Sequence, residues 1–279
     1  MEPPMTSGSE EQTPRFYAKP GLNAETYDVR VANDWANEGE PGDVQFIMNL
    51  AQNTGGPVLE LASGTGRVLW PLADTGFECV GLDLNPSMLT MAQAKRDQYD
   101  KSVCSRIRFV EASMTSFELE QQFALIYCTF RSFQMLLEPE LQRQCLQCAH
   151  RHLKPGGTLM LNLFDPRLHL VVADTTEWKR PRSQVNHPVS GNPVALDIVD
   201  READPFSQTF VETWRFTEYG DDGSGIRCED ECLRMRWTYR HEMRYLLELC
   251  GFDIESEHSD FNGGPPTYGR EQVWVARRV

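Results

Sequence analysis

Two acidic side chains and two glycines stand at spacings that suit a nucleoside ligand. Glu60 lies four residues before Gly64, Gly66 follows after one residue, and Asp83 comes at the end of a second apolar run. Glycine lacks a Cβ and lets a ligand approach the backbone, and a carboxylate can accept hydrogen bonds from a ribose diol. The pattern therefore predicts a nucleoside-containing cofactor.

These four residues need two strands and a helix to bring them together. The apolar run at residues 58–61 predicts a strand, residues 67–74 a helix, and residues 78–82 a second strand. A strand that ends in a turn of small residues and leads into a helix directs backbone N–H groups and a helix N-terminus to one point. We therefore expect a βαβ unit whose tip binds the cofactor.

The spacing of the glycines discriminates between cofactors. A dinucleotide site has a third glycine, in the pattern G-x-G-x-x-G, and Leu69 occupies that position here. The Glu60 carboxylate would repel a pyrophosphate but would suit a cationic amino-acid group. A NAD-dependent oxidoreductase is therefore the less favoured enzyme class.

At these positions the chain resembles the class I S-adenosylmethionine-dependent methyltransferases. The segments that match are residues 60–66, with the pattern E-x-x-x-G-x-G, residues 81–89, and the Leu-Lys-Pro-Gly-Gly segment at residues 153–157. With the last two strands, the resemblance covers about residues 42–165 and 240–279. It implies S-adenosyl-L-methionine as cofactor, S-adenosyl-L-homocysteine as product, and methyl transfer (EC 2.1.1) as activity.

The resemblance also assigns cofactor contacts. Glu60 and the backbone around Ala62, Gly64 and Gly66 would hold the methionine portion, and Asp83 would hold the ribose hydroxyls. The remaining implied contacts, most of them to the adenine, are Leu84, Met88, Ser113, Met114 and Cys128. Ser113 stands where family members usually have Asp, so this contact carries no charge.

The acceptor side is less clearly marked. Open α/β sheets place their ligands at the carboxyl ends of the strands, so residues 128–134 are expected to line the reaction site. Arg131 could bind a substrate carboxylate or phosphate, or pair with Glu60 or the N-terminal segment. A hydroxyl acceptor would benefit from a general base, for which the candidates are Tyr17, Tyr27, Asp165, His169 and His241. An amine acceptor needs only to arrive neutral.

The order of expected elements predicts the fold class and the domains. Strands and helices alternate up to residue 164, which is typical of a parallel sheet with helices on both faces. With the resemblance, this predicts a Rossmann-like, seven-stranded, mostly parallel sheet with an inserted antiparallel β flap. We expect four parts: a flexible tail (1–14), a lid (15–40), a cofactor-binding domain (41–166 and 239–279) and the flap (167–238).

Composition restricts the partners. The formal net charge of −14 and the pI of about 4.9 argue against nucleic acid. No apolar run approaches the roughly 18 residues of a membrane span, and no N-terminal targeting pattern is present, so a cytoplasmic protein is expected. The eight cysteines are scattered and read as reduced thiols rather than metal ligands.

The sequence therefore favours a methyltransferase acting on an N or O atom of a small-molecule acceptor enclosed by the flap. The alternatives are a methyltransferase-like sensor or scaffold without turnover, and an enzyme with a macromolecular acceptor. The tryptophans of the flap could instead form a homodimer surface.

Overall fold

The structure is a computed structural model that describes residues 16–17, 19–38, 42–167 and 181–279. The strands are β1 (Val58–Leu61), β2 (Cys79–Asp83), β3 (Ile107–Glu111), β4 (Phe123–Cys128), β5 (Leu153–Phe164), β6 (Pro181–Asn186), β7 (Pro193–Asp204), β8 (Thr209–Tyr219), β9 (Gly225–Arg236), β10 (Phe252–His258) and β11 (Glu271–Arg278). The α-helices are α1 (Leu22–Glu25), α2 (Tyr27–Glu38), α3 (Asp43–Thr54), α4 (Leu69–Asp74), α5 (Pro86–Ala94), α6 (Lys101–Cys104), α7 (Pro139–His152) and α9 (Arg240–Leu249), with 3-10 turns η1 (Lys95–Gln98) and η2 (Ser132–Met135). The predicted tail, residues 1–14, lies outside the described residues.

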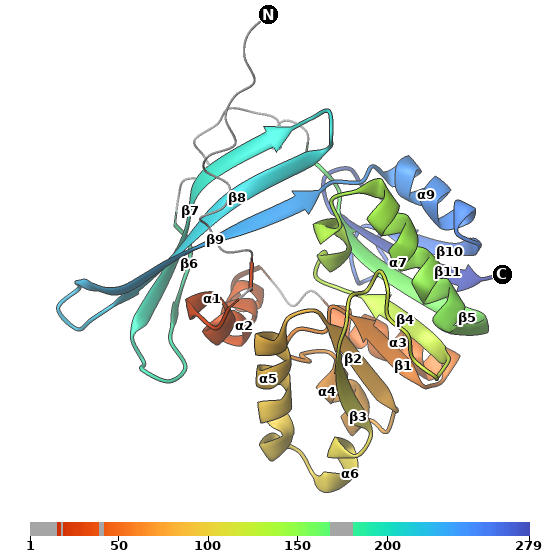
Figure 1. The fold of residues 1–279 in the computed structure, drawn as a ribbon, viewed down its shortest axis with the longest axis horizontal. Helices are drawn as coiled ribbons and strands as arrows, with labels where there is room; N and C mark the ends of the chain where they lie inside the picture. The colour runs from red at the N-terminus through yellow and green to blue at the C-terminus, as the bar shows by residue number, and fades with distance from the viewer. Residues whose placement is uncertain (1–15, 18, 39–41, 168–180) are drawn as a thin grey trace, which may run out of the picture.

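A seven-stranded sheet forms the larger layer, in the order β10-β11-β5-β4-β1-β2-β3 (Figure 1). Strands β1 to β5 run parallel, whereas β11 is antiparallel to both β5 and β10. β1 pairs with β2 on one side and with β4 on the other, so the direction of chain progression reverses there. Such a switch point is where open α/β sheets bind ligands, and the predicted fold class is confirmed.

Two separate cores cover the faces of this sheet. One core joins the strands to α7 and α9 through Cys145, Leu146, Met243 and Leu247. The other joins them to α3 and α4, for which Ile47 and Leu72 are fully buried. All four positions of β1 are buried, as expected for a central parallel strand covered on both faces.

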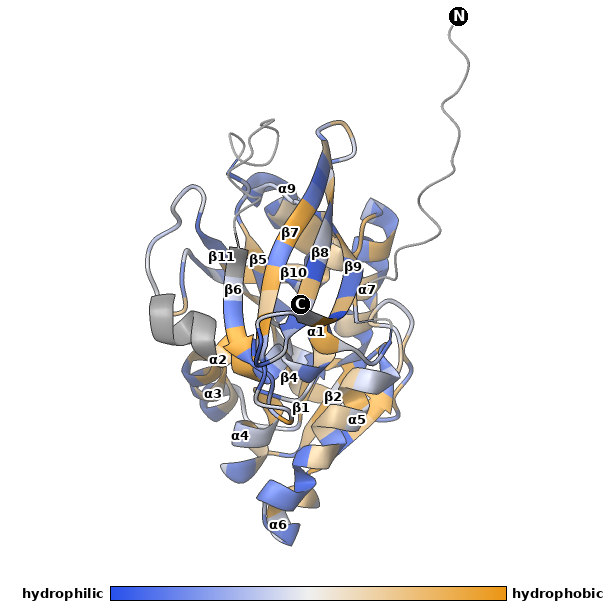
Figure 2. Ribbon diagram, turned by 90° about the vertical axis from the view of Figure 1, so that its left-hand side faces the viewer, coloured by the Kyte–Doolittle hydropathy of each residue, from blue (hydrophilic) through white to orange (hydrophobic). Residues whose placement is uncertain are grey.

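The smaller sheet is antiparallel, with the order β6-β7-β8-β9. Buried and less buried positions alternate along β7 and β8, and the strands are correspondingly banded in orange and blue in Figure 2. Its buried face holds Phe210, Trp214, Phe216 and Leu233, and Leu22 of α1 packs into the same cluster. The lid helix α1 is therefore held by the inserted sheet, which we call the flap.

Some expected elements differ from the structure. The helix expected up to residue 99 ends at Ala94 and continues as η1, because the polar run that follows has no apolar face to bury. The short helix α6 and strand β6 were not predicted; β6 has the sequence PRSQVN, which lacks a clear alternation. The strand β6 is instead stabilised by its backbone pairing with β7.

Candidate functional site

The turn after β1 has the left-handed backbone that a close ligand approach requires. Ala62 (φ 55°), Gly64 (φ 53°) and Gly66 (φ 70°) all have positive φ. A Cβ on Gly66 would lie 3.0 Å from Phe109 Cζ and 3.1 Å from Trp70 Cδ1, so glycine is needed there for space as well as for conformation. We call residues 60–66 together with Asp83 the cofactor cradle.

Asp83, at the end of β2, is tied to this turn. Its Oδ2 accepts a hydrogen bond from the Gly64 backbone N–H at 2.7 Å, and its Oδ1 accepts one from the Asn85 N–H at 2.8 Å. Burial raises the pKa of Asp83, and these backbone donors oppose that effect. Asn85 in turn caps α5 by accepting from Ser87 N–H at 3.0 Å, as its position before Pro86 predicts.

Glu60 is a buried carboxylate with an unused acceptor. Thr129 Oγ1 lies 3.4 Å from Glu60 Oε1, whereas Oε2 is buried without a hydrogen-bond partner. Burial raises the pKa of Glu60 to about 8, against the lowering effect of the Arg67 guanidinium. A buried acidic oxygen without a donor suits a ligand that brings a positive charge and N–H groups. The residues present therefore fit the methionine portion of S-adenosylmethionine.

The remaining residues assigned to the cofactor, most of them to the adenine, lie around the carboxyl ends of β2, β3 and β4. The Leu84 side chain is 70% exposed at the end of β2, which leaves an apolar surface open to a ligand. Met88 is buried against the turn, its Cε 3.4 Å from the position of a Cβ on Gly64. Ser113 Oγ shares a 2.8 Å hydrogen bond with Thr115 Oγ1. Cys128 is fully buried at the end of β4.

A hollow of about 300 Å³ lies beside this end of the cradle, between α1 and α5. Pro20 and Ala24 line it from the lid, and Pro86, Ser87 and Met91 line it from α5. Since Leu84 and Asn85 immediately precede α5, the hollow lies next to the predicted adenosine contacts.

The segment after β4 adopts a strained conformation. Phe130 (φ 57°) and Arg131 (φ 64°) are two consecutive non-glycine residues in the left-handed region, which costs about 1 kcal/mol or more for each. Five non-glycine residues of the described chain have a positive φ, and only Gln208 among them lies away from the lid and the carboxyl ends of β1 and β4. Backbone strain concentrated in this way is typical of a functional site.

Arg131 was expected to pair with substrate, Glu60 or the lid. In the structure it forms an ion pair with Glu271 at the start of β11. Arg67 directly follows the cradle, and its guanidinium lowers the pKa of Glu60 against the larger effect of burial. It pairs with the buried Asp43, and its guanidinium lies 5.6 Å from the centre of the Phe130 ring. Arg67, which the sequence did not single out, thus interacts with both Glu60 of the cradle and Phe130.

A line of aromatic rings links the end of β4 to the flap. Phe130 and Tyr27 have ring centroids 6.0 Å apart, and Tyr27 and Tyr17 are 5.8 Å apart. Phe16 continues the line, 4.6 Å from Tyr17 and 5.0 Å from Trp214 of β8. Burial raises the pKa of both tyrosine hydroxyls, so neither favours the ionised form that a base would need. The rings instead form a continuous aromatic contact from the end of β4 through the lid to the flap.

The other base candidates are placed differently. Asp165 is buried but engaged, since it accepts hydrogen bonds from Gly269 N–H and Gln272 Nε2 at 2.7 and 3.0 Å. His241 is exposed on α9, and His169 lies outside the described residues. Among the described residues, no three His, Cys, Asp or Glu side chains are grouped to hold a metal ion.

The lid is fastened to the cradle by a polar contact that the sequence did not reveal. Asp28 of α2 accepts a hydrogen bond from Thr65 Oγ1 at 2.7 Å and forms an ion pair with Lys95 Nζ at 2.8 Å. Lys95 also donates to Thr65 Oγ1 at 3.1 Å. Because Thr65 stands between Gly64 and Gly66, α2 is joined directly to the cofactor-binding turn.

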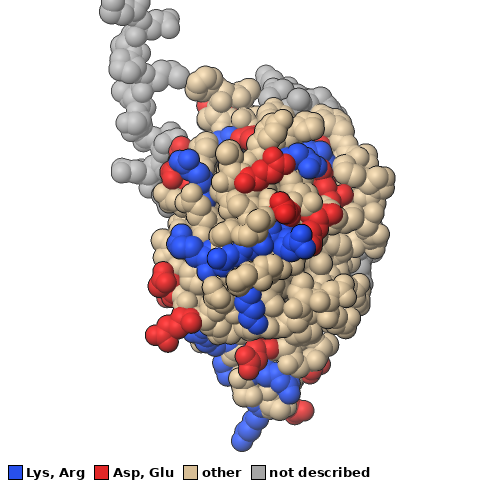
Figure 3. Space-filling view, turned by 90° about the vertical axis from the view of Figure 1, so that its right-hand side faces the viewer, with Lys and Arg blue, Asp and Glu red and all other residues tan. Residues whose placement is uncertain are grey.

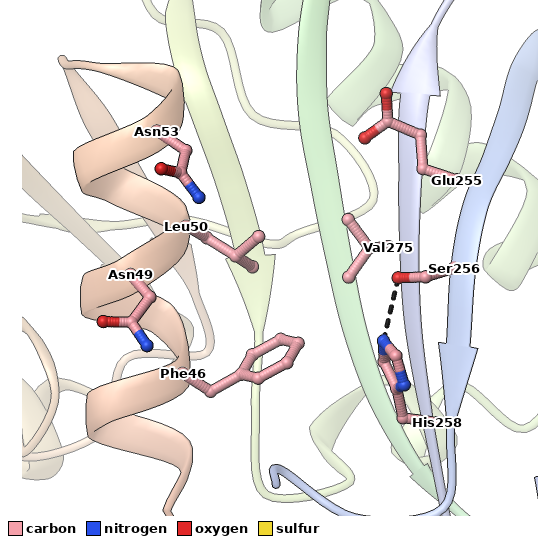
Figure 4. Close-up of a pocket in the computed structure, with 8 residues that line it drawn as sticks. All are labelled: Phe46, Asn49, Leu50, Asn53, Glu255, Ser256, His258 and Val275. Carbon is pink, nitrogen blue, oxygen red and sulfur yellow. Dashed lines mark hydrogen bonds between the residues drawn. The ribbon is translucent and has the colours of Figure 1, made fainter. Parts of the chain in front are cut away.

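A second hollow, of about 320 Å³, lies between α3 and the edge of the sheet (Figure 4). Phe46 and Leu50 line it from the helix, and Val275 and His258 from the strands, where His258 Nε2 lies 3.0 Å from Ser256 Oγ. No residue that the sequence predicted for the site lines this hollow.

Comparison with known proteins agrees with the geometry. A family model described as a methyltransferase domain matches residues 58–157. The chain is 30% identical over 238 residues to the cypemycin N-terminal methyltransferase of a Streptomyces species, a match that covers 85% of this chain and 89% of that protein.

Solved structures share the fold, including the added sheet. The CcbJ methyltransferase from Streptomyces caelestis has a TM-score of 0.71 and 23% identity, over 95% of this chain and 98% of that one. CalS10 with bound S-adenosylmethionine, an amino pentose methyltransferase from Micromonospora echinaspora, has a TM-score of 0.64 and 20% identity, over 94% and 99% of the two chains. The chain thus belongs to the class I S-adenosylmethionine-dependent methyltransferases that carry an inserted antiparallel sheet, and S-adenosylmethionine is its cofactor.

Proposed function

We propose that the protein methylates an amine nitrogen of a small molecule enclosed between the cradle, the lid and the flap. The observation that carries this proposal is the aromatic line from Phe130 through Tyr27, Tyr17 and Phe16 to Trp214. It gives the space beside the cradle an apolar wall that a small organic acceptor can contact. Aromatic faces also attract cations, which favours an amine over a neutral alcohol.

The names of some relatives support nitrogen as the acceptor atom, whereas others are named as O-methyltransferases. The cypemycin enzyme is named for an N-terminus and CalS10 for an amino sugar. An ammonium ion has no lone pair, so the acceptor must first release a proton to solvent. The neutral amine then attacks with its own lone pair and needs no further base for the transfer itself. The engaged Asp165 and the exposed His241 would then have no part in the chemistry.

We assign the cofactor to the cradle as follows. S-adenosylmethionine supplies a methyl group activated on a sulfonium centre. Glu60 Oε2 would accept hydrogen bonds from N–H groups of the methionine portion of the cofactor, and Asp83 would accept hydrogen bonds from the ribose hydroxyls. The backbone of Ala62, Gly64 and Gly66 would lie along the methionine portion. Adenine contacts are assigned to Leu84 and Met88 after β2 and to Ser113 and Met114 after β3, and a further cofactor contact is assigned to Cys128 at the end of β4.

Catalysis would then rest on positioning and on exclusion of water. Arg67 and Phe130 border the reacting end, and Tyr27 and Tyr17 close it from the lid. The assignment of residues 15–40 as lid, 167–238 as flap and 41–166 with 239–279 as cofactor domain is part of this proposal.

The surface charges support a small-molecule acceptor rather than nucleic acid. On the face around α9, basic side chains lie next to acidic ones (Figure 3). Arg240 and Arg244 both pair with Glu257, and Arg277 pairs with Glu255. Such paired charges do not make the concentrated basic surface that binds a phosphate backbone. No helix of the described chain is long and apolar enough to cross a membrane.

The test combines binding and turnover. Calorimetry should detect S-adenosylmethionine and S-adenosylhomocysteine but not NAD. Transfer of a labelled methyl group should then occur to members of an amine library, and more weakly or not at all to matched phenols and alcohols. Transfer only to alcohols would contradict nitrogen as the acceptor, and cofactor binding without any transfer would favour a sensor or scaffold. Size-exclusion chromatography of the same sample tests whether the protein forms a homodimer.

A further inference from the structure

A buried carboxylate on the flap has an acceptor that the protein leaves unused. Glu231 of β9 is 0% exposed. Its Oε2 accepts hydrogen bonds from the Tyr17 backbone N–H at 2.9 Å and from Asn23 Nδ2 at 2.6 Å, whereas Oε1 has no partner. Leaving a buried charged oxygen unsatisfied is costly, so Oε1 is suited to a donor from outside the chain.

Arg30, whose charge acts on Glu231, does not supply that donor. Arg30 lies close enough to lower the pKa of Glu231, although burial raises it more. Its own hydrogen bonds go to Thr26 Oγ1 at 3.1 Å and to Asn23 O and Oδ1 at 2.9 and 2.5 Å. Arg30 therefore holds Asn23 in place, and Asn23 holds only one oxygen of Glu231.

The position of Glu231 connects it to the acceptor side. It lies directly opposite Trp214 in the pairing of β9 with β8, and it binds the backbone of Tyr17. Both residues belong to the aromatic line that ends at Phe130 beside the cradle. A carboxylate among aromatic rings combines the two features that recognise an organic ammonium ion, a negative charge and π faces.

A neighbouring acid provides the contrast. Glu229, two residues earlier on β9, has both oxygens engaged: Oε1 accepts from Arg227 Nε at 2.7 Å and Oε2 from the Leu22 N–H at 2.8 Å. Glu212 accepts from Trp214 Nε1 at 2.6 Å and pairs with Arg201 at 3.5 Å. Of these three inserted-sheet acids, Glu231 alone combines full burial with an unpartnered oxygen.

We propose that Glu231 Oε1 is the subsite that recognises an ammonium group of the methyl acceptor, with Tyr17 and Trp214 as its aromatic surroundings. The inference rests on the proposed function and makes it narrower: the acceptor is an amine with an apolar body that is recognised as its ammonium form and reacts after release of a proton to solvent. The role is recognition and orientation of the acceptor, separate from cofactor binding by Glu60 and Asp83.

The experiment measures binding to the full-length protein saturated with S-adenosylhomocysteine. The probes are pairs of equal shape, phenethylammonium with phenethyl alcohol and cyclohexylammonium with cyclohexanol, titrated by calorimetry. The wild-type protein should prefer the ammonium member of at least one pair about tenfold or more, the range of a charged hydrogen bond. Glu231→Gln should bring that ratio close to one, whereas Glu229→Gln should leave it unchanged.

Three results would overturn the proposal: no ammonium preference in either pair, an unchanged preference in Glu231→Gln, or an equal loss in Glu229→Gln. Thermal unfolding and affinity for S-adenosylhomocysteine monitor whether each variant is folded. If Glu231→Gln does not fold, Glu231→Asp keeps the charge and should retain a reduced ammonium preference; complete retention or complete loss would count against the assignment. Failure to bind S-adenosylhomocysteine at all would instead refute the cofactor assignment.

Discussion

The cofactor cradle and the lid–flap side are built from different kinds of contact. The cradle joins residues at most 23 positions apart, and many of its groups are backbone atoms held by glycine geometry or by the Asp83 carboxylate. On the other side, Tyr17 and Asn23 reach Glu231 across 214 and 208 residues. Because few side chains belong to both regions, substitutions on the lid–flap side can change the acceptor without changing cofactor binding in the cradle.

The largest expected effect compares two left-handed glycines, Gly66 in the cradle and Gly191 in the flap. Both have positive φ, but a Cβ on Gly66 meets Phe109 and Trp70, whereas one on Gly191 meets nothing within 4 Å. Alanine at either position should cost roughly 1–2 kcal/mol of conformational strain, and Gly66→Ala about 1–3 kcal/mol more from overpacking. Urea unfolding of the two variants measures the difference; equal destabilisation would show that packing around the turn is loose.

The next effect separates cofactor binding from acceptor binding. Asp83→Ala should weaken S-adenosylhomocysteine binding by about 1–3 kcal/mol, because a charged acceptor is lost. The matched control is Glu111→Ala, since Glu111 is exposed and lies opposite Asp83 on β3. Calorimetry should show a loss only for Asp83→Ala. Unchanged affinity would remove Asp83 from the proposed ribose contact.

The titration of Glu60 should give the cradle a pH dependence. Its pKa in the folded, ligand-free protein is raised from 4.5 to about 8, so it is mainly protonated at neutral pH. A cationic ligand favours the ionised form, and the affinity for S-adenosylmethionine should therefore rise by up to about tenfold per pH unit below pH 8 and level off above it. Stability of the ligand-free protein should change in the opposite direction, falling as the pH rises from about 4.5 through 8, because the fold favours the protonated acid.

Binding and unfolding measured between these pH values test both signs. Glu60→Gln should bind the cofactor more weakly at high pH and lose most of the pH dependence, which distinguishes Glu60 from titration of the cofactor itself. A dependence that persists in this variant would assign the titration to another group.

The smallest effect concerns the contact that joins the two regions. Lys95→Met removes the ion pair with Asp28 and the hydrogen bond to Thr65, both partly exposed to solvent. Such pairs contribute less than about 1 kcal/mol, so S-adenosylhomocysteine should dissociate at most about fivefold faster as the lid loosens. Arg143→Met, which removes the exposed pair with Glu140 on α7, serves as control and should leave the dissociation rate unchanged. Equal dissociation rates for Lys95→Met and the wild-type protein in stopped-flow measurements would show that this contact does not limit cofactor release.

The cradle could be predicted from sequence because its signals are local. The apolar run of β1, the glycines and the Asn85-Pro86 helix start lie next to one another, and each reflects a backbone preference that holds in any context. The alternation of strands and helices likewise predicted the parallel sheet. In contrast, β6 was missed because its polar sequence becomes a strand only through its neighbour β7.

The acceptor side could not be predicted in the same way. Tyr17 and Tyr27 were candidates, but nothing in their spacing indicated that Phe16 and Trp214 would extend them into one line. The partner of Arg131 was also missed, since Glu271 is 140 residues away. Pairing over such separations depends on how the lid and the added sheet pack against the central domain.

By itself, the sequence determined a parallel α/β sheet and a nucleoside-binding turn, because a strand, a glycine turn and a terminal acid specify a local backbone geometry. The resemblance of these motifs to the class I methyltransferases then indicated the methyl donor. Only the tertiary structure decided that Glu231 is buried with one oxygen unpartnered, that Thr65 is joined to Asp28, and that strain gathers at Phe130 and Arg131. Burial and unused hydrogen-bonding capacity are properties of the whole packed chain. They arise where distant segments meet, and no local pattern encodes them.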